Sequence, residues 1–71
     1  MISMNLTNLR KRARLTQEEL AEKIGVTRQA IAKWEKGEST PDLEKCVALS
    51  RVFQVSMDDL ISYDEENSLF P

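Results

Sequence analysis

Apolar residues recur three or four positions apart over five stretches of the chain, the spacing that gathers side chains on one face of a helix. The pattern predicts helices over about residues 5–12, 16–24, 27–36, 40–53 and 56–61. We expect no strand, because the alternating stretches are short and no hairpin signal joins two of them. The sequence therefore predicts an all-α fold, a compact five-helix bundle.

The residues around the second and third helices are typical of helix ends. Thr16 and Glu19 have the spacing of a capping box at the start of the second helix. Gly25 ends that helix, at a point where the chain needs a positive φ. Thr27 is then the N-cap of the third helix, two residues after the glycine. We therefore expect two short helices joined by a tight turn.

The later helices have start signals of the same kind. Thr40 and Pro41 are expected to begin the fourth helix, with the proline at the first helical position. Ser56 is expected to cap the fifth helix, with Asp59 completing a second capping box. The side chains expected to face the core are Ile2, Leu6, Leu9, Ala13, Leu20, Ala21, Ile24, Val26, Ala30, Ile31, Trp34, Leu43, Cys46, Val47, Leu49, Ser50, Phe53 and Leu60, with Met57 or Ile61.

The third helix separates its residues into two chemical faces. At about 100° per residue, Ala30, Ile31 and Trp34 fall together on one side. The opposite side is cationic and amide-bearing, has no acid, and consists of Arg28, Gln29, Ala32, Lys33 and Lys36. A helix of this kind can seat its apolar side on a core and present hydrogen-bonding groups to the edges of DNA bases.

Length and composition limit the possible classes of protein. With 71 residues, 41% of them apolar, we expect one small globular domain over residues 1–62 and a short acidic, then apolar, tail over 63–71. A lone Cys46 and no histidine exclude an internal disulfide and a tetrahedral metal site, and we expect no cofactor. No apolar run is long enough for a membrane span or a secretory signal, so a cytoplasmic, nucleoid-associated protein is expected.

The charge is distributed unevenly along the chain. Residues 1–37 hold eight Lys and Arg against four Glu, a net charge of +4, whereas residues 38–71 carry a net charge of −6. Binding of a polyanion depends on the field at the contacting surface, so the total of −2 does not exclude nucleic acid. We expect the basic half to face DNA and the acidic half to face away.

The motifs together resemble the lambda-repressor-like, Xre/Cro-type helix-turn-helix DNA-binding family over residues 4–61. The matching positions are Leu6, Arg10, Leu15 to Ala21, Gly25 to Thr27, Ile31 to Gly37, Pro41 and Leu43 through Leu60. The resemblance implies a five-helix domain that inserts its third helix into the major groove of double-stranded DNA. It also implies a transcriptional regulator, most often a repressor, that binds a palindromic operator as a dimer.

The resemblance also implies roles for individual residues. Base edges are assigned to Arg28, Gln29, Ala32 and Lys33, and phosphate contacts to Gln17, Thr27, Lys36 and Arg10. The backbone N–H groups of the loop 37–40 resemble a phosphate-contacting loop, although the acid Glu38 departs from that pattern. Each role has a simpler alternative. The polar side of the third helix could be only a solvated face, Gln17 could be only an exposed residue at a helix start, and Thr27 could act only as a cap.

Arg10 and Glu35 resemble a family pair that joins the first helix to the third. Such a pair would fix the angle of the third helix; the alternative is two unpaired surface charges. Ser50 is expected to bond a carbonyl one turn back, and Cys46 to fill the core.

A second functional class remains open: an antitoxin or another module that binds a partner protein. Only the tail, with Leu69 and Phe70, favours it. The same two residues, with Met57 and Ile61, are candidates for a homodimer contact, against the alternative of scattered surface apolar residues. We expect no enzyme, because no histidine, phosphate loop or apolar cleft accompanies the acids.

Overall fold

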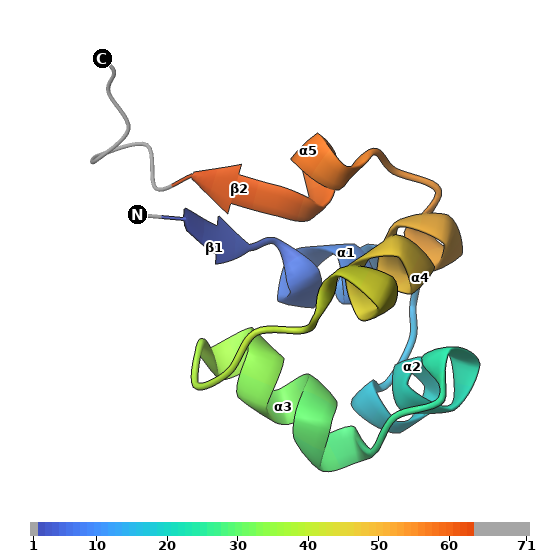
Figure 1. The fold of residues 1–71 in the computed structure, drawn as a ribbon. Helices are drawn as coiled ribbons and strands as arrows, with labels where there is room; N and C mark the ends of the chain where they lie inside the picture. The colour runs from blue at the N-terminus through green and yellow to red at the C-terminus, as the bar shows by residue number, and fades with distance from the viewer. Residues whose placement is uncertain (1, 64–71) are drawn as a thin grey trace.

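The computed structural model describes residues 2–63, and their side chains over residues 5–61 (Figure 1). Five helices follow one another along the chain, and one short strand lies at each end of the described part. The elements are β1 (Ile2–Met4), α1 (Leu6–Arg12), α2 (Gln17–Ile24), α3 (Arg28–Lys36), α4 (Leu43–Phe53), α5 (Met57–Leu60) and β2 (Ile61–Tyr63). None of these described helices has the length and apolar character needed to cross a membrane.

Each helix contributes one fully buried side chain to a single core. These five side chains are Leu6, Leu20, Ile31, Leu49 and Leu60. Burying a leucine or isoleucine contributes about 1.5–3 kcal/mol, so the five together hold the helices around one centre. Trp34, Phe53 and other half-buried apolar residues pack against this cluster. The predicted five-helix fold is confirmed.

The turn between α2 and α3 forms as the sequence predicts. The Thr16 hydroxyl accepts a hydrogen bond from the Glu19 N–H at 3.0 Å, and Glu19 Oε1 accepts one from the Thr16 N–H at 2.8 Å, which completes the capping box. Gly25 has φ of 76°, in the left-handed region where glycine is favoured. Thr27 caps α3 by accepting from the Ala30 N–H. These caps end α2 at Gly25 and start a separate helix after Thr27.

The start of α4 differs from the prediction. Asp42, not Thr40, is the N-cap, and Pro41 lies outside the helix. The Asp42 carboxylate accepts a hydrogen bond from the Lys45 N–H at 2.9 Å and so caps the helix. Pro41 has no side-chain acceptor that could do the same. Leu43 is the first residue of α4 and is 73% exposed, so its expected place in the core is wrong.

Two smaller expectations are also wrong. Ala13 is exposed, because α1 ends at Arg12 and the helical spacing no longer applies beyond it. Ser56 accepts from the Asp59 N–H, but the Asp59 side chain does not return a bond to the cap. A capping box uses Glu or Gln at this position, and Asp is one methylene shorter. Ser50 does bond a carbonyl, that of Val47, at 2.8 Å.

The two strands were not predicted. β1 and β2 pair antiparallel, with Ile2 opposite Tyr63 and Met4 opposite Ile61, and the Asn5 N–H donates to the Leu60 carbonyl. Three-residue strands at opposite ends of the sequence have no hairpin signal, since helix packing alone brings them together. β2 includes Tyr63, the first residue of the predicted tail; residues 64–71, with Leu69 and Phe70, lie outside the described residues.

Candidate nucleic-acid interface

The outer face of α3 is the largest group of exposed cationic and amide side chains on one helix of the described chain. Ile31 is fully buried and Trp34 is half-buried on the inner side, as predicted. Arg28, Gln29, Lys33 and Lys36 are exposed on the opposite side, with the half-buried Ala32 between them. In Figure 1, α2 and α3 lie at one end of the molecule and α5 with the strands at the other.

The first turn of α3, like that of α1, has no acid to complement the helix dipole, whereas Lys33 and Lys36 in the last turn of α3 do complement it. Acidic residues occupy the first turn of α2, α4 and α5, where they complement the helix dipole. α3 has none there and begins with Arg28 instead. Neither ion pair found among the described side chains involves Arg28, Lys33 or Lys36. The positive charge of this face is therefore available to an external anion.

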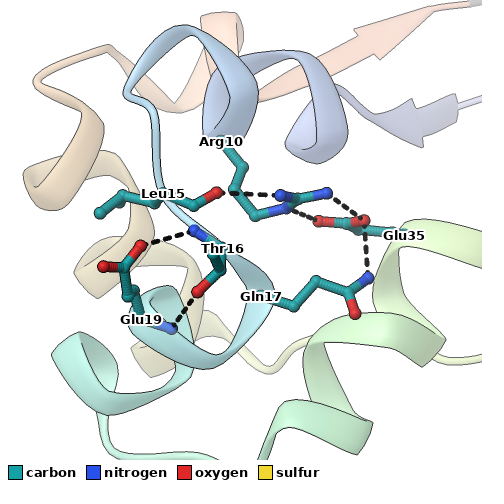
Figure 2. Close-up of polar contacts among 6 residues, drawn as sticks. All are labelled: Arg10, Leu15, Thr16, Gln17, Glu19 and Glu35. Atoms are coloured by element: carbon teal, nitrogen blue, oxygen red, sulfur yellow. Dashed lines mark hydrogen bonds and ion pairs between the residues drawn. The ribbon is translucent and has the colours of Figure 1, made fainter.

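A polar network behind α3 joins three helices (Figure 2). Arg10 of α1 forms an ion pair with Glu35 of α3, with Nε 2.6 Å from Oε2 and a second bond of 3.3 Å to Oε1. Its third hydrogen bond goes to the Leu15 carbonyl at 2.9 Å. Gln17, the first residue of α2, donates from Nε2 to Glu35 Oε1 at 3.1 Å. The pair expected from the sequence forms, and Glu35 accepts bonds from two helices at once.

Burial and charge act in opposite directions on Glu35. The side chains of Arg10 and Glu35 are only 14% and 8% exposed. Burial raises the pKa of the Glu35 carboxyl, but the hydrogen bonds from Arg10 and Gln17 and the positive charge of Arg10 outweigh it. The pKa of Glu35 therefore lies below its ordinary value of 4.5. The carboxylate stays ionised and holds α3 against α1 and α2.

The network changes how two of the predicted phosphate ligands are used. The guanidinium hydrogen bonds of Arg10 go to Glu35 and to the Leu15 carbonyl, so the pair forms, and the expected phosphate contact of Arg10 stays a prediction. Gln17 is half-buried, and its amide is engaged with Glu35. The sequence contained no signal for this second link, because residues 17 and 35 have no common local motif. The use of the Leu15 carbonyl as an acceptor was missed for the same reason.

The loop after α3 offers less to a phosphate than its sequence suggested. Gly37, with φ of 78°, ends the helix, and its N–H donates to the Trp34 carbonyl. The Glu38 N–H donates to the Lys33 carbonyl at 2.9 Å. Both groups complete the C-terminal cap of α3, so they are not free to bind a DNA backbone. Thr27, by contrast, keeps an exposed side chain at the start of α3.

Two helices joined by a tight glycine turn, with an exposed cationic and amide face on the second, define a helix-turn-helix protein of the DNA-binding type. The helix-turn-helix family model matches residues 6–60. The chain belongs to this family, in its lambda-repressor-like, Xre/Cro-type form.

The related sequences are transcriptional regulators of the helix-turn-helix type. The chain is 45% identical over 60 residues to the transcriptional activator BcrR of Enterococcus faecalis and 36% identical over 70 residues to the transcriptional regulator YqaE of Bacillus subtilis. These matches cover 84% and 99% of this chain but 29% and 60% of the relatives. An archaeal regulator from Archaeoglobus fulgidus is 38% identical, with 86% of each chain covered.

The similar solved structures include a DNA complex. The P22 c2 repressor bound to a synthetic operator superposes with a TM-score of 0.74 at 36% identity, covering 78% of this chain and 83% of that one. A transcriptional regulator from Listeria innocua gives a TM-score of 0.77 at 34% identity, covering 86% of this chain and 57% of the other. The fold is therefore that of the repressor DNA-binding domains.

Proposed function

We propose that this chain binds double-stranded DNA in a sequence-specific manner by inserting α3 into the major groove, and that it regulates transcription. The exposed face of α3 is the observation that carries the proposal, because its donors have no partner among the described residues while its apolar side is fixed in the core. We propose that the chain does so in the cytoplasm, associated with the nucleoid.

The side chains of α3 fit the pattern of groups in the major groove. Arg28 and Lys33 can donate to the O6 and N7 atoms of guanine, and Gln29 can bond adenine through both its amide oxygen and its amide nitrogen. Ala32, which lies between them, leaves room for close approach and can touch a thymine methyl. A good bidentate contact contributes about 1–3 kcal/mol of discrimination between bases.

Phosphate contacts flank these bases. The N-terminus of α2, at Gln17, presents unpaired backbone N–H groups and the positive end of the helix dipole. Thr27 and Lys36 lie at the two ends of α3, so each can reach the backbone beside the groove. These groups would position the domain without reading the sequence.

We further propose that two copies bind a palindromic operator and repress transcription by occupying a promoter. Two α3 helices in successive major grooves lie about 34–36 Å apart, which sets the spacing of the half-sites. Met57 begins α5 and Ile61 follows it. Both are half-buried, and Met57 packs against the core on one side. We propose that their remaining exposed surface contributes to the dimer contact together with Leu69 and Phe70. Sedimentation at micromolar concentration measures the state without DNA.

The sign of regulation requires its own test, because BcrR is an activator and P22 c2 is a repressor. A reporter whose promoter overlaps the selected operator should lose expression when the chain is produced. A rise in expression would contradict repression and leave DNA binding unaffected. The antitoxin alternative depends on residues outside the described part, and no described feature favours it.

The experiment that tests the DNA-binding proposal begins with selection of bound sequences from random duplex DNA. Arg28→Ala and Lys33→Ala should each reduce the preference for operator over random duplex by about 5- to 150-fold, which corresponds to 1–3 kcal/mol. Lys36→Ala should weaken both duplexes similarly and lower the log–log salt slope by about 0.9. Arg51→Ala, which removes an exposed cation from α4, is the matched control and should change neither. Equal losses on both duplexes for every α3 variant would contradict the proposal.

A further inference from the structure

An open groove lies between the end of α1 and the end of α4. It consists of two adjoining hollows of about 490 Å³ and 270 Å³, and Ala13 and Val52 line both of them. Leu15 and Lys23 also line the larger hollow, and the smaller one reaches Arg12 and Phe53. None of the described residues that line the groove belongs to α3, so the groove is separate from the surface proposed to bind DNA.

The groove has an apolar floor and a cationic rim. Leu15, Val52 and Phe53 are half-buried and pack against the core with one side, while another side lines the groove. Arg12 and Lys23 are exposed, and neither takes part in the ion pairs found among the described side chains. No acid is among the described residues that line the groove. A segment with carboxylates beside bulky apolar side chains complements such a surface.

The chain itself contains a segment of this composition. Residues 64–71 lie outside the described residues, and their sequence has three acids, Asp64, Glu65 and Glu66, and no Lys or Arg. Leu69 and Phe70 follow these acids, so the segment pairs negative charge with two apolar anchors. Its charge is opposite to that of the rim, which favours encounter and orients the segment on the groove.

The position of β2 decides which copy supplies the segment. In Figure 1, β2 ends on one side of the molecule, whereas α1 and α4 both end on the opposite side. Residues 64–70 reach about 25 Å when fully extended, and in its own chain the segment would have to run past the helices to enter the groove. The segment of a second copy can approach the groove directly from solvent.

We propose that the groove of one copy binds residues 64–70 of a second copy, with Leu69 and Phe70 on the apolar floor and the acids at Arg12 and Lys23. Each copy supplies one segment and one groove, so two-fold symmetry gives the dimer two identical contacts. This inference rests on the proposed dimer and assigns Leu69 and Phe70 their binding surface. It does not depend on how α3 reads bases.

Sedimentation equilibrium of the full chain without DNA, at micromolar concentration, tests the contact. The double variant Leu69→Ser, Phe70→Ser should raise the dimer dissociation constant by at least about 10-fold, because buried apolar anchors dominate such interfaces. Ala13→Glu should raise it by a similar factor, because it places a carboxylate at a residue that lines both hollows. Ala13 is exposed, so this variant should keep its fold, which circular dichroism checks.

Asn8→Glu is the matched control for Ala13→Glu. It adds the same charge at an exposed residue of α1 that does not line the groove, and the dissociation constant should stay unchanged. Added salt should weaken the wild-type dimer, because the charges of the rim are exposed. A dimer that both the segment variant and Ala13→Glu leave intact would overturn the inference.

NMR of the ¹⁵N-labelled chain identifies the source of the segment. The amide shifts of Lys23 and Val52 should change on dilution of the wild type and stay constant on dilution of the double segment variant. Shifts that depend on Phe70 but not on concentration would mean that each groove binds the segment of its own chain, which overturns the assignment to a second copy. A wild type that binds operator but stays monomeric in these experiments would overturn this inference alone. A segment-dependent dimer that binds no duplex would overturn only the DNA-binding proposal.

Discussion

Replacing Arg10 by methionine tests the network that holds α3 in place. The substitution keeps a long apolar stem but removes three hydrogen bonds: two to Glu35 and one to the Leu15 carbonyl. Glu35, with only 8% of its side chain exposed, would then retain the bond from Gln17 but no ionic partner. The variant therefore leaves a nearly buried carboxylate without its counter-charge.

The size of the effect follows from the burial of the pair. Removing one partner of a buried ion pair costs about 3–5 kcal/mol. Arg10 is 14% exposed and Gln17 remains, so we expect a loss near the lower end, about 3 kcal/mol. A domain of this size has a total stability of roughly 4–11 kcal/mol, so Arg10→Met should be strongly destabilised and can be partly unfolded. The double variant Arg10→Met, Glu35→Leu removes both charges and should lie within about 1 kcal/mol of the wild type.

Urea unfolding at pH 7, followed by far-ultraviolet circular dichroism, measures these differences. Lys11→Met changes an exposed cation on the same helix and is the matched control, expected within about 0.5 kcal/mol of the wild type. A loss below about 1 kcal/mol for Arg10→Met would refute the assigned burial of the pair. A double variant as unstable as the single one would show that lost packing, not the unpaired charge, is the cause.

Three further results are expected. The pKa of Glu35 lies below its ordinary value, so its stabilising contribution is complete at neutral pH and declines as the pH falls through 4.5 and then through the folded-state pKa. Urea midpoints measured from pH 7 to 3 should therefore fall more steeply for the wild type than for Glu35→Gln. Parallel curves for the two proteins would contradict this. Gly25→Ala should lower the free energy of unfolding in urea by about 1–2 kcal/mol. The loss comes from the φ of 76° alone, because a Cβ added at Gly25 meets no atom within 4 Å. An unchanged midpoint would count against that backbone conformation. Arg14 is a non-glycine residue in the left-handed region, with φ of 60°. Arg14→Gly should therefore stabilise the fold by about 0.5–1 kcal/mol and raise the thermal midpoint. A lower midpoint would mean that the arginine side chain stabilises the turn.

The parts of the fold that local patterns specify were predictable from the sequence. The Thr16 and Glu19 capping box, the Gly25 turn and the inward Ile31 each depend on residues three or four positions apart. The strands were not predictable, because Ile2–Met4 and Ile61–Tyr63 meet only after the helices have packed. The start of α4 was misplaced because two signals compete there, and the carboxylate of Asp42 is a better cap than the sequence Thr40-Pro41 suggested.

The candidate site also has parts that were predictable from the sequence and parts that were not. The exposed face of α3 follows from helical geometry alone, and the ion pair between Arg10 and Glu35 followed from the family resemblance. The inward direction of Gln17 depends on the packing of α2 against α3, which no local pattern encodes. Sequence reasoning could therefore name the residues of the surface, but not which of them act on one another.

Chemical protection of the selected operator tests the central claim most directly. Dimethyl sulfate methylates guanine at N7 in the major groove and adenine at N3 in the minor groove. If α3 presents Arg28 and Lys33 to base edges, bound protein should protect guanine N7 atoms in both half-sites, and Arg28→Ala should lose protection at particular guanines. Protection confined to adenine N3, or an unprotected operator at saturating protein, would contradict the account.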